Sequence, residues 1–160
     1  MKSYFIYILL FLPMFSFAQI EEGQIILQSE TEEATSVYSA DIDGDGDLDV
    51  VSTSSNDNKV AWYKNEDGQG TFGMEQIISS NAIEAGFVHV ADLDGDGDQD
   101  LLSASFGDGY VAWYRNEDGL GNFVEQELSF SFLNGVNTIY GADMDAVSYT
   151  HLTLPTICSV

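Results

Sequence analysis

Two nine-residue runs in this sequence place an aspartate at every second position, with glycines between several of them. The first run is 41–49 (DIDGDGDLD) and the second is 92–100 (DLDGDGDQD). Five carboxylates so close along one chain repel one another unless a cation lies between them. Hard divalent cations prefer oxygen ligands, and a flexible all-oxygen loop favours Ca²⁺ over Mg²⁺. The runs therefore predict two calcium sites.

The spacing assigns a role to each aspartate by its position in the loop. Positions 1, 3 and 5 supply carboxylate oxygens, and the glycine at position 6 allows the sharp turn that gathers them. Position 7 supplies its backbone carbonyl and leaves its own carboxylate free, whereas position 9 closes the shell through both carboxylate oxygens. We predict the following metal-binding residues: Asp41, Asp43, Asp45, Asp47, Asp49, Asp92, Asp94, Asp96, Asp98, Asp100 and, in a third and incomplete copy, Asp143 and Asp145.

A helical calcium motif of the EF-hand or dockerin type shares the first six positions of this pattern. It also requires a glutamate at position 12 and a helix after the loop. Position 12 is Ser52 or Ser103, and each loop runs into an apolar Val-Val or Leu-Leu pair. We therefore expect a strand after each loop. The remaining alternative, a solvated acidic turn without metal, does not account for two full copies in register.

Each aspartate run belongs to a repeat with a period of 51 residues. Between 41–68 and 92–119, 18 of 28 positions are identical, and 141–145 begins a third copy on the same spacing. We expect four strands in each unit, separated by Gly-rich and Asn-rich turns. In the first unit these strands are 37–40, 49–54, 59–65 and 72–78, and in the second the first strand is 87–91.

Both faces of the third strand are apolar, because Val60 and Trp62 point to one side while Ala61 and Tyr63 point to the other. A lone four-stranded unit cannot cover both faces, whereas blades stacked around an axis can. The sequence predicts an all-β fold of β-propeller blades, four-stranded antiparallel units of about 51 residues in an incomplete ring. A stacked β-solenoid is the alternative, although its coils are usually shorter and lack paired hairpins.

The two ends of the chain differ from the repeats. Residues 1–18 combine Lys2, an apolar stretch and Ser16-Phe17-Ala18, which is typical of a secretory signal peptide cleaved before residue 19. We expect 19–145 to hold two complete units and the start of a third. After 145 the repeat stops within the motif, and 147–156 resembles a translated sequencing adapter. The alternative is a genuine divergent C-terminus. We interpret 146–160 as adapter read-through, which would leave His151 and Cys158 without biological meaning.

The charge of the chain excludes several classes of partner. There are 27 Asp and Glu residues against four Lys and Arg, a formal net charge of −23. Nucleic acids and anionic lipids require basic residues, so we expect no nucleic-acid partner and no membrane insertion after signal cleavage. The single cysteine cannot form an intrachain disulfide. A secreted domain without disulfides needs another stabiliser, and bound metal would supply it.

No residue pattern in the sequence indicates an active site. The position of His89 is occupied by Tyr38 and Tyr140 in the neighbouring copies, which predicts an aromatic strand position rather than a catalytic base. We assign the Trp-Tyr pairs at 62–63 and 113–114 to the core rather than to a sugar-stacking surface. Aspartates around a bound calcium stay ionised, so they cannot serve as general acids. We predict that the chain is not an enzyme.

The units resemble the FG-GAP-like (VCBS-type) repeats, which are related to the propeller blades of integrin α subunits. The resemblance covers roughly 23–145 and is carried by the Asp-x-Asp-Gly-Asp-Gly-x-x-Asp loop, the Phe106-Gly107-x-Gly109 turn and the Ala-Trp-Tyr-x-Asn strand. It implies that Ca²⁺ is held in a β-hairpin of each blade, and rings of this kind commonly have seven blades. The first copy departs from the pattern, with Ser55-Asn56 in place of Phe-Gly.

These observations predict a secreted, extracellular or cell-surface calcium-binding propeller scaffold for binding or adhesion, without catalytic activity. Its ligand would be an unidentified extracellular protein or carbohydrate. The sequence leaves one alternative open: a propeller module of a larger secreted enzyme, such as one acting on polysaccharide, with its catalytic domain elsewhere.

Overall fold

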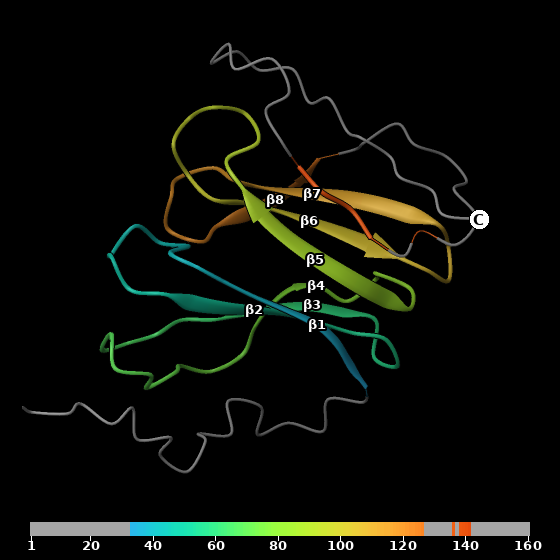
Figure 1. Ribbon diagram of the computed structural model, residues 1–160, viewed down its shortest axis with the longest axis horizontal. Helices are drawn as coiled ribbons and strands as arrows, with labels where there is room; N and C mark the ends of the chain where they lie inside the picture. Colours follow the sequence, from blue (N-terminus) through green and yellow to red (C-terminus); the bar gives the residue numbers. More distant parts are fainter. Residues whose placement is uncertain (1–32, 127–135, 137, 142–160) are drawn as a thin grey trace, which may run out of the picture.

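The computed structural model describes residues 33–126, 136 and 138–141, which form two sheets, one lying over the other (Figure 1). Each sheet has four antiparallel strands, and each strand pairs with its neighbours in sequence. The first sheet contains β1 (Ala34–Ala40), β2 (Asp49–Ser54), β3 (Lys59–Tyr63) and β4 (Gln76–Ser79). The second sheet contains β5 (Ala85–Ala91), β6 (Asp100–Ser105), β7 (Tyr110–Asn116) and β8 (Phe123–Gln126).

The predicted all-β fold class of four-stranded blades is confirmed. The described part of the chain contains no helix, and so no helix long and apolar enough to cross a membrane. A strand follows each aspartate loop, as the apolar pairs after position 9 indicated, and β2 has the predicted bounds. The first strands are longer than expected and begin at Ala34 and Ala85.

The predicted fourth strand at 72–78 is wrong in its start. In the first unit only an isolated bridge joins Asn65 to Phe72, and β4 begins at Gln76, which pairs with Trp62. In the second unit, pairing runs without interruption from Phe123 to Gln126. The reason is one extra residue: Phe72 and Gln76 are four apart, whereas Phe123 and Gln126 are three apart. An extra residue in one strand of an antiparallel pair produces a bulge.

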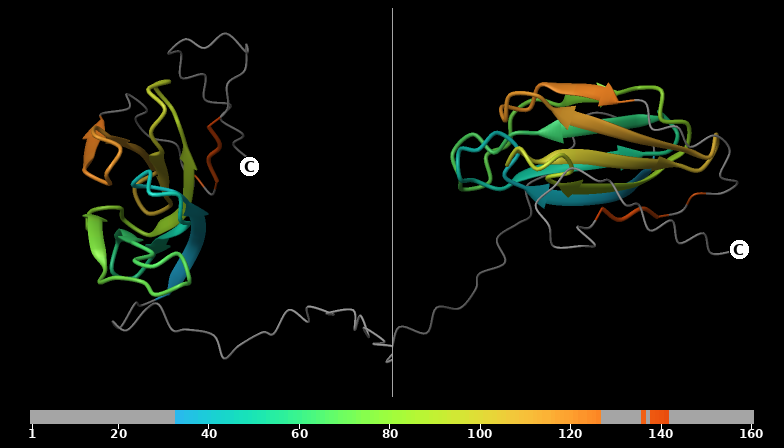
Figure 2. Two further views of the ribbon diagram at one scale, coloured as in Figure 1. Left: turned by 90° about the vertical axis from the view of Figure 1, so that its left-hand side faces the viewer. Right: turned by 90° about the horizontal axis from the view of Figure 1, so that it is seen from above.

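The two sheets pack face to face and share one hydrophobic core (Figure 2). The predicted burial of both faces of the third strand is confirmed, since Val60, Ala61, Trp62 and Tyr63 are all buried. The Trp62 ring meets Phe123 of the second sheet edge-on, with ring centroids 6.4 Å apart. The core between the sheets contains Ile42, Val51, Val60, Trp62, Ala82, Ala85, Val88, Val90, Leu101, Ala112 and Tyr114.

The other face of the second sheet packs against the beginning of the third repeat. Val136 and Ile139 join Leu102, Ala104 and Val111 in a second hydrophobic cluster. The second sheet is therefore covered on both sides, as a blade inside a stack must be.

The contact between neighbouring units follows the sequence repeat. Val37, Val88 and Ile139 occupy equivalent positions at the 51-residue spacing. Val88 packs into the core between the two sheets, and Ile139 packs into the cluster beyond the second sheet. Val37 has no preceding unit among the described residues, and it is 69% exposed. Each unit thus presents the same face to the unit before it.

Three equivalent aromatic positions form a ladder along the first strands of successive units. The ring of His89 meets Tyr38 edge-on at 5.4 Å and stacks on Tyr140 at 4.3 Å. His89 is buried, and burial lowers the pKa of its imidazole below the usual value of 6.5. The prediction of a repeated aromatic site at this position is confirmed.

Candidate metal centres

Each aspartate run forms the loop that joins the first two strands of its sheet, between β1 and β2 or between β5 and β6. The loops lie at corresponding ends of neighbouring blades, and residues of both line one shallow hollow. Gly44, Gly46, Gly95 and Gly97 have positive φ angles, a conformation that side chains rarely adopt. The glycines therefore fold each loop tightly enough to bring alternate aspartates together.

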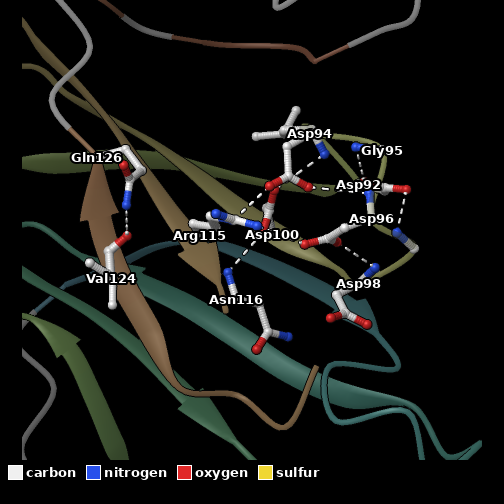
Figure 3. Close-up of polar contacts among 12 residues, drawn as sticks. Asp92, Asp94, Gly95, Asp96, Asp98, Asp100, Arg115, Asn116, Val124 and Gln126 are labelled. Atoms are coloured by element: carbon white, nitrogen blue, oxygen red, sulfur yellow. Dashed lines mark hydrogen bonds and ion pairs between the residues drawn. The ribbon is translucent and has the colours of Figure 1, made fainter. Parts of the chain in front are cut away.

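The carboxylates at positions 1, 3 and 5 converge in both loops. One oxygen from each of Asp41, Asp43 and Asp45 lies within 4.8 Å of the other two. The same relation holds for Asp92, Asp94 and Asp96 (Figure 3). The structure thus brings together six of the twelve predicted ligands in two clusters that could hold a metal ion.

Backbone N–H groups orient these carboxylates. The Gly46 amide donates to Asp41 Oδ2 and the Asp47 amide donates to Asp45 Oδ1, each at 3.0 Å. The second loop repeats both contacts, from Gly97 to Asp92 and from Asp98 to Asp96, also at 3.0 Å. These hydrogen bonds fix the carboxylates in place within each loop.

Two oxygens of the first loop are buried without a partner, namely Asp41 Oδ1 and Asp43 Oδ1. The Asp43 side chain is only 8% exposed. A buried carboxylate oxygen that accepts no hydrogen bond is costly unless a cation neutralises it. The donor set fits a hard divalent cation, since Asp41, Asp43 and Asp45 offer only carboxylate oxygens.

The aspartates at position 9 lie outside the clusters and bind the backbone. Asp49 and Asp100 are fully buried. Asp49 accepts hydrogen bonds from the amides of Ile42 at 3.2 Å and Asn65 at 2.7 Å, one on each carboxylate oxygen. Asp49 thus ties the start of its loop to the end of the third strand. Burial raises the pKa of Asp49, because it disfavours the charged carboxylate.

Asp100 has the same arrangement with one more donor. It accepts hydrogen bonds from the amides of Leu93 and Asn116 and from the Trp113 indole, at 3.2, 2.8 and 3.1 Å. Burial raises its pKa to about 6, although these hydrogen bonds oppose the shift. The equivalent Trp62 indole Nε1 is buried and has no hydrogen-bond partner of good geometry.

The aspartates at position 7 also lie apart from the clusters. The carboxylate of Asp47 packs against Gly68, and that of Asp98 packs against Gly119, so closely that a Cβ at either glycine would collide with it. Both glycines have a φ of +65°. The remaining predicted ligands, Asp143 and Asp145, lie outside the described residues.

A basic side chain reaches into each loop, which the sequence analysis missed. Lys64 Nζ contacts Asp43 Oδ2 and lies 3.0 Å from Asp45 Oδ2. These contacts raise the pKa of Lys64, and its ammonium group is the main cause of the lowered pKa of Asp45. Arg115 is the equivalent residue, with Nε 2.6 Å from Asp94 Oδ2 and an Nη atom 3.2 Å from Asp96 Oδ2 (Figure 3).

A signal for these basic residues was present in the sequence. The chain has only four Lys and Arg, and two of them stand 51 residues apart at the same position of the repeat. Such a coincidence in so acidic a chain indicates a common role.

An asparagine links the second loop to the first. The side chain of Asn116 is fully buried, and its Nδ2 donates to Gln99 O at 3.3 Å and across the blades to Ile42 O at 2.9 Å. Its Oδ1 accepts a hydrogen bond from the Gly121 amide at 3.0 Å. Ile42 belongs to the first aspartate loop, so one side chain holds parts of both loops together.

These features define a β-propeller-like repeat module, in which antiparallel four-stranded units stack through a repeated face and carry an aspartate loop in their first hairpin. A family model of the FG-GAP-like repeat matches residues 41–103 and 92–146. The chain belongs to the FG-GAP-like repeat family, and the resemblance seen in its sequence is confirmed. A search of curated proteins found no match to this chain.

Proposed function

We propose that this chain is a secreted, calcium-binding propeller scaffold that acts in extracellular binding or adhesion and performs no catalysis. The observation that carries the calcium assignment is the pair of buried, unpartnered oxygens of Asp41 and Asp43 in a cluster of three carboxylates. Bound Ca²⁺ would neutralise these oxygens. Asp41, Asp43 and Asp45 would hold one ion, and Asp92, Asp94 and Asp96 would hold another.

A titration of the full chain tests the calcium assignment. We expect two sites with dissociation constants of about 10⁻⁴–10⁻³ M, the range of extracellular calcium modules, and weaker binding of Mg²⁺. The Asp43→Ala and Asp94→Ala variants should each lose one site by calorimetry. Asp108→Ala is the matched control, because Asp108 is an exposed aspartate in a turn outside the loops and should leave both sites intact. No calcium heat, or equal binding of Mg²⁺, would contradict the assignment.

Calcium should also stabilise the fold. At a free concentration ten times the dissociation constant, each site adds about 1.4 kcal/mol to the free energy of unfolding. Chelation should lower the melting temperature by more than this binding energy alone predicts, because it also leaves the loop carboxylates to repel one another. An unchanged melting temperature in EGTA would show that metal does not support the fold.

Two further observations support the non-catalytic and extracellular parts of the proposal. His89, the histidine of the described residues, is buried between the rings of Tyr38 and Tyr140, as an aromatic strand position would be. Residues 1–18 have the sequence of a signal peptide, so the exported product should begin at residue 19. Mass spectrometry of the N-terminus of the secreted protein checks the cleavage, and an intact N-terminus would contradict it. An extracellular protein or carbohydrate is the proposed ligand class.

A further inference from the structure

The basic side chain beside each aspartate loop contacts carboxylate oxygens that a bound metal would also need. Lys64 contacts Asp43 and Asp45, and Arg115 contacts Asp94 and Asp96. In each loop two of the three clustered carboxylates are therefore already paired with a positive charge of the chain itself. The third carboxylate, at position 1, is held by a glycine amide instead.

In the second loop, each carboxylate oxygen of Asp94 and Asp96 already has a partner within the chain. Asp94 Oδ1 accepts from the Asp96 amide, and Asp96 Oδ1 accepts from the Asp98 amide. The Oδ2 atoms of both aspartates are the atoms that Arg115 contacts. A metal that takes these Oδ2 atoms must replace the guanidinium group, since Ca²⁺ needs its ligands at about 2.3–2.6 Å.

The first loop is more open. Asp41 Oδ1 and Asp43 Oδ1 have no partner, so they can meet an ion while Lys64 still contacts the Oδ2 atoms. Lys64 therefore opposes the metal mainly through repulsion between two cations at short range.

Both sets of ion pairs are partly exposed to solvent, so breaking them costs little free energy. The side chains of Lys64 and Arg115 are 36% and 39% exposed, and partly exposed pairs contribute little to stability. A divalent cation that gains the three carboxylates of the second loop can displace Arg115, and the released side chain can then be hydrated.

We propose that Lys64 and Arg115 are intrinsic competitors of the metal: each neutralises its loop in the absence of calcium and lowers the calcium affinity of that loop. Calcium must displace Arg115, whereas Lys64 stays beside the ion and repels it. This inference rests on the calcium assignment proposed above. It assigns control of calcium affinity to two residues that are not themselves metal ligands.

The affinity test removes each charge in turn from the full chain. Arg115→Met should raise the calcium affinity of the second loop about tenfold, because calcium no longer has to displace two exposed ion pairs. Lys64→Met should raise the calcium affinity of the first loop about threefold, because it removes only the repulsion between two cations. The amide signals of Gly97 and Gly46 report the two loops separately in a calcium titration followed by NMR. Lys59→Met is the matched control, because Lys59 pairs with Asp57 and Glu75 outside the loops.

A second measurement on the unmodified chain detects the displacement directly. Arg115 is the only arginine of the sequence, so its Nε–H gives a single arginine signal. Arg115 Nε is buried beside Asp94, and this burial should protect its proton from exchange with water in EGTA. Saturating calcium should shift the signal and speed its exchange. This readout needs no variant to fold.

The outcomes separate this inference from the calcium assignment. If calcium moves neither glycine signal in the unmodified chain, the calcium assignment fails. If calcium binds but Arg115→Met and Lys64→Met bind it no more tightly than Lys59→Met, the competition is refuted. An Nε–H signal that stays protected in saturating calcium would also overturn the proposal, because it would show that the guanidinium group remains on its carboxylates.

Discussion

The two blades are identical at 18 of the 28 positions that begin with the aspartate loop and include the Trp-Tyr strand, yet they differ in how completely their neighbours cover them. Val88 of the second blade is 1% exposed, whereas the equivalent Val37 of the first blade is 69% exposed. The second blade lies between the first blade and the start of the third repeat, and the first blade has only one described neighbour. Burial at such a position is therefore decided by the adjoining unit and not by the residue.

The same contrast extends to the polar groups. Asn116 donates across the blade interface to Ile42, whereas the equivalent Asn65 bonds only within its own unit, to Leu48 O at 3.2 Å and from the Gly70 amide. A neighbour thus adds a hydrogen bond to a buried group as well as covering apolar surface. A second contrast lies within the blades themselves, where Asp100 accepts three hydrogen bonds and Asp49 accepts two. The comparison leads to three predictions.

The largest difference is expected at the two asparagines. Asn116→Ala should lower the free energy of unfolding by about 3 kcal/mol, because it leaves two carbonyl groups and one amide unpaired inside the protein. Asn65→Ala should cost about 2 kcal/mol, since it breaks no bond between blades. Urea unfolding of the full chain in EGTA measures both values.

The control for these variants is Asn122→Ala. Asn122 is an exposed turn residue of the second blade, and its loss should cost under about 1 kcal/mol. Equal losses at Asn116 and Asn65 would show that the bond between the blades adds nothing to stability.

A smaller difference is expected at the buried aspartates. An asparagine keeps the shape of aspartate but presents an NH₂ group where a second acceptor oxygen was, so one or more donors lose their partner. Asp100→Asn should cost about 2 kcal/mol and Asp49→Asn about 1 kcal/mol, because Asp100 satisfies the Trp113 indole in addition. Both are measured in EGTA, so that bound metal does not enter the comparison. A larger loss for Asp49→Asn would contradict this ranking.

The smallest effect concerns pH and the aromatic ladder. The pKa of His89 is lowered by burial, so the fold favours the neutral imidazole. The stability that this contributes is present above the unfolded value of about 6.5 and is lost as the pH falls through the lower folded pKa. The His89→Tyr variant, which gives the second blade the residue of its neighbours, should remove this loss. Melting temperatures between pH 7.5 and 5.5 test it, and parallel curves for the two proteins would refute it.

Most of the fold follows from features that are local or periodic in the sequence. The 51-residue repeat and the alternation of apolar residues indicated four-stranded units, and β2 has the predicted bounds. The three carboxylates that converge stand at positions 1, 3 and 5 of a short loop, where glycine turns alone suffice to gather them. These features need no knowledge of distant parts of the chain.

The missed features depend on contacts between separate segments. Asp49 and Asp100 resemble ligands by spacing, but their carboxylates are turned toward amides at the end of the third strand. Lys64 and Arg115 reach the loops only because the third strand runs beside them. The irregular start of β4 comes from one extra residue before Gln76, which the comparison of the two copies could have revealed.

The complementary faces of each unit have a consequence for how such a gene can lengthen. The face that Val88 presents fits the sheet before it, and the opposite face of the same unit accepts Ile139 of the next repeat. A tandem duplication of one whole repeat therefore yields a new blade that already matches both of its neighbours, wherever in the array it is inserted. A tandem duplication of part of a repeat would break the register at the junction that it creates. Growth of the array by in-frame steps of 51 codons is thus the change that disturbs the packing between units least.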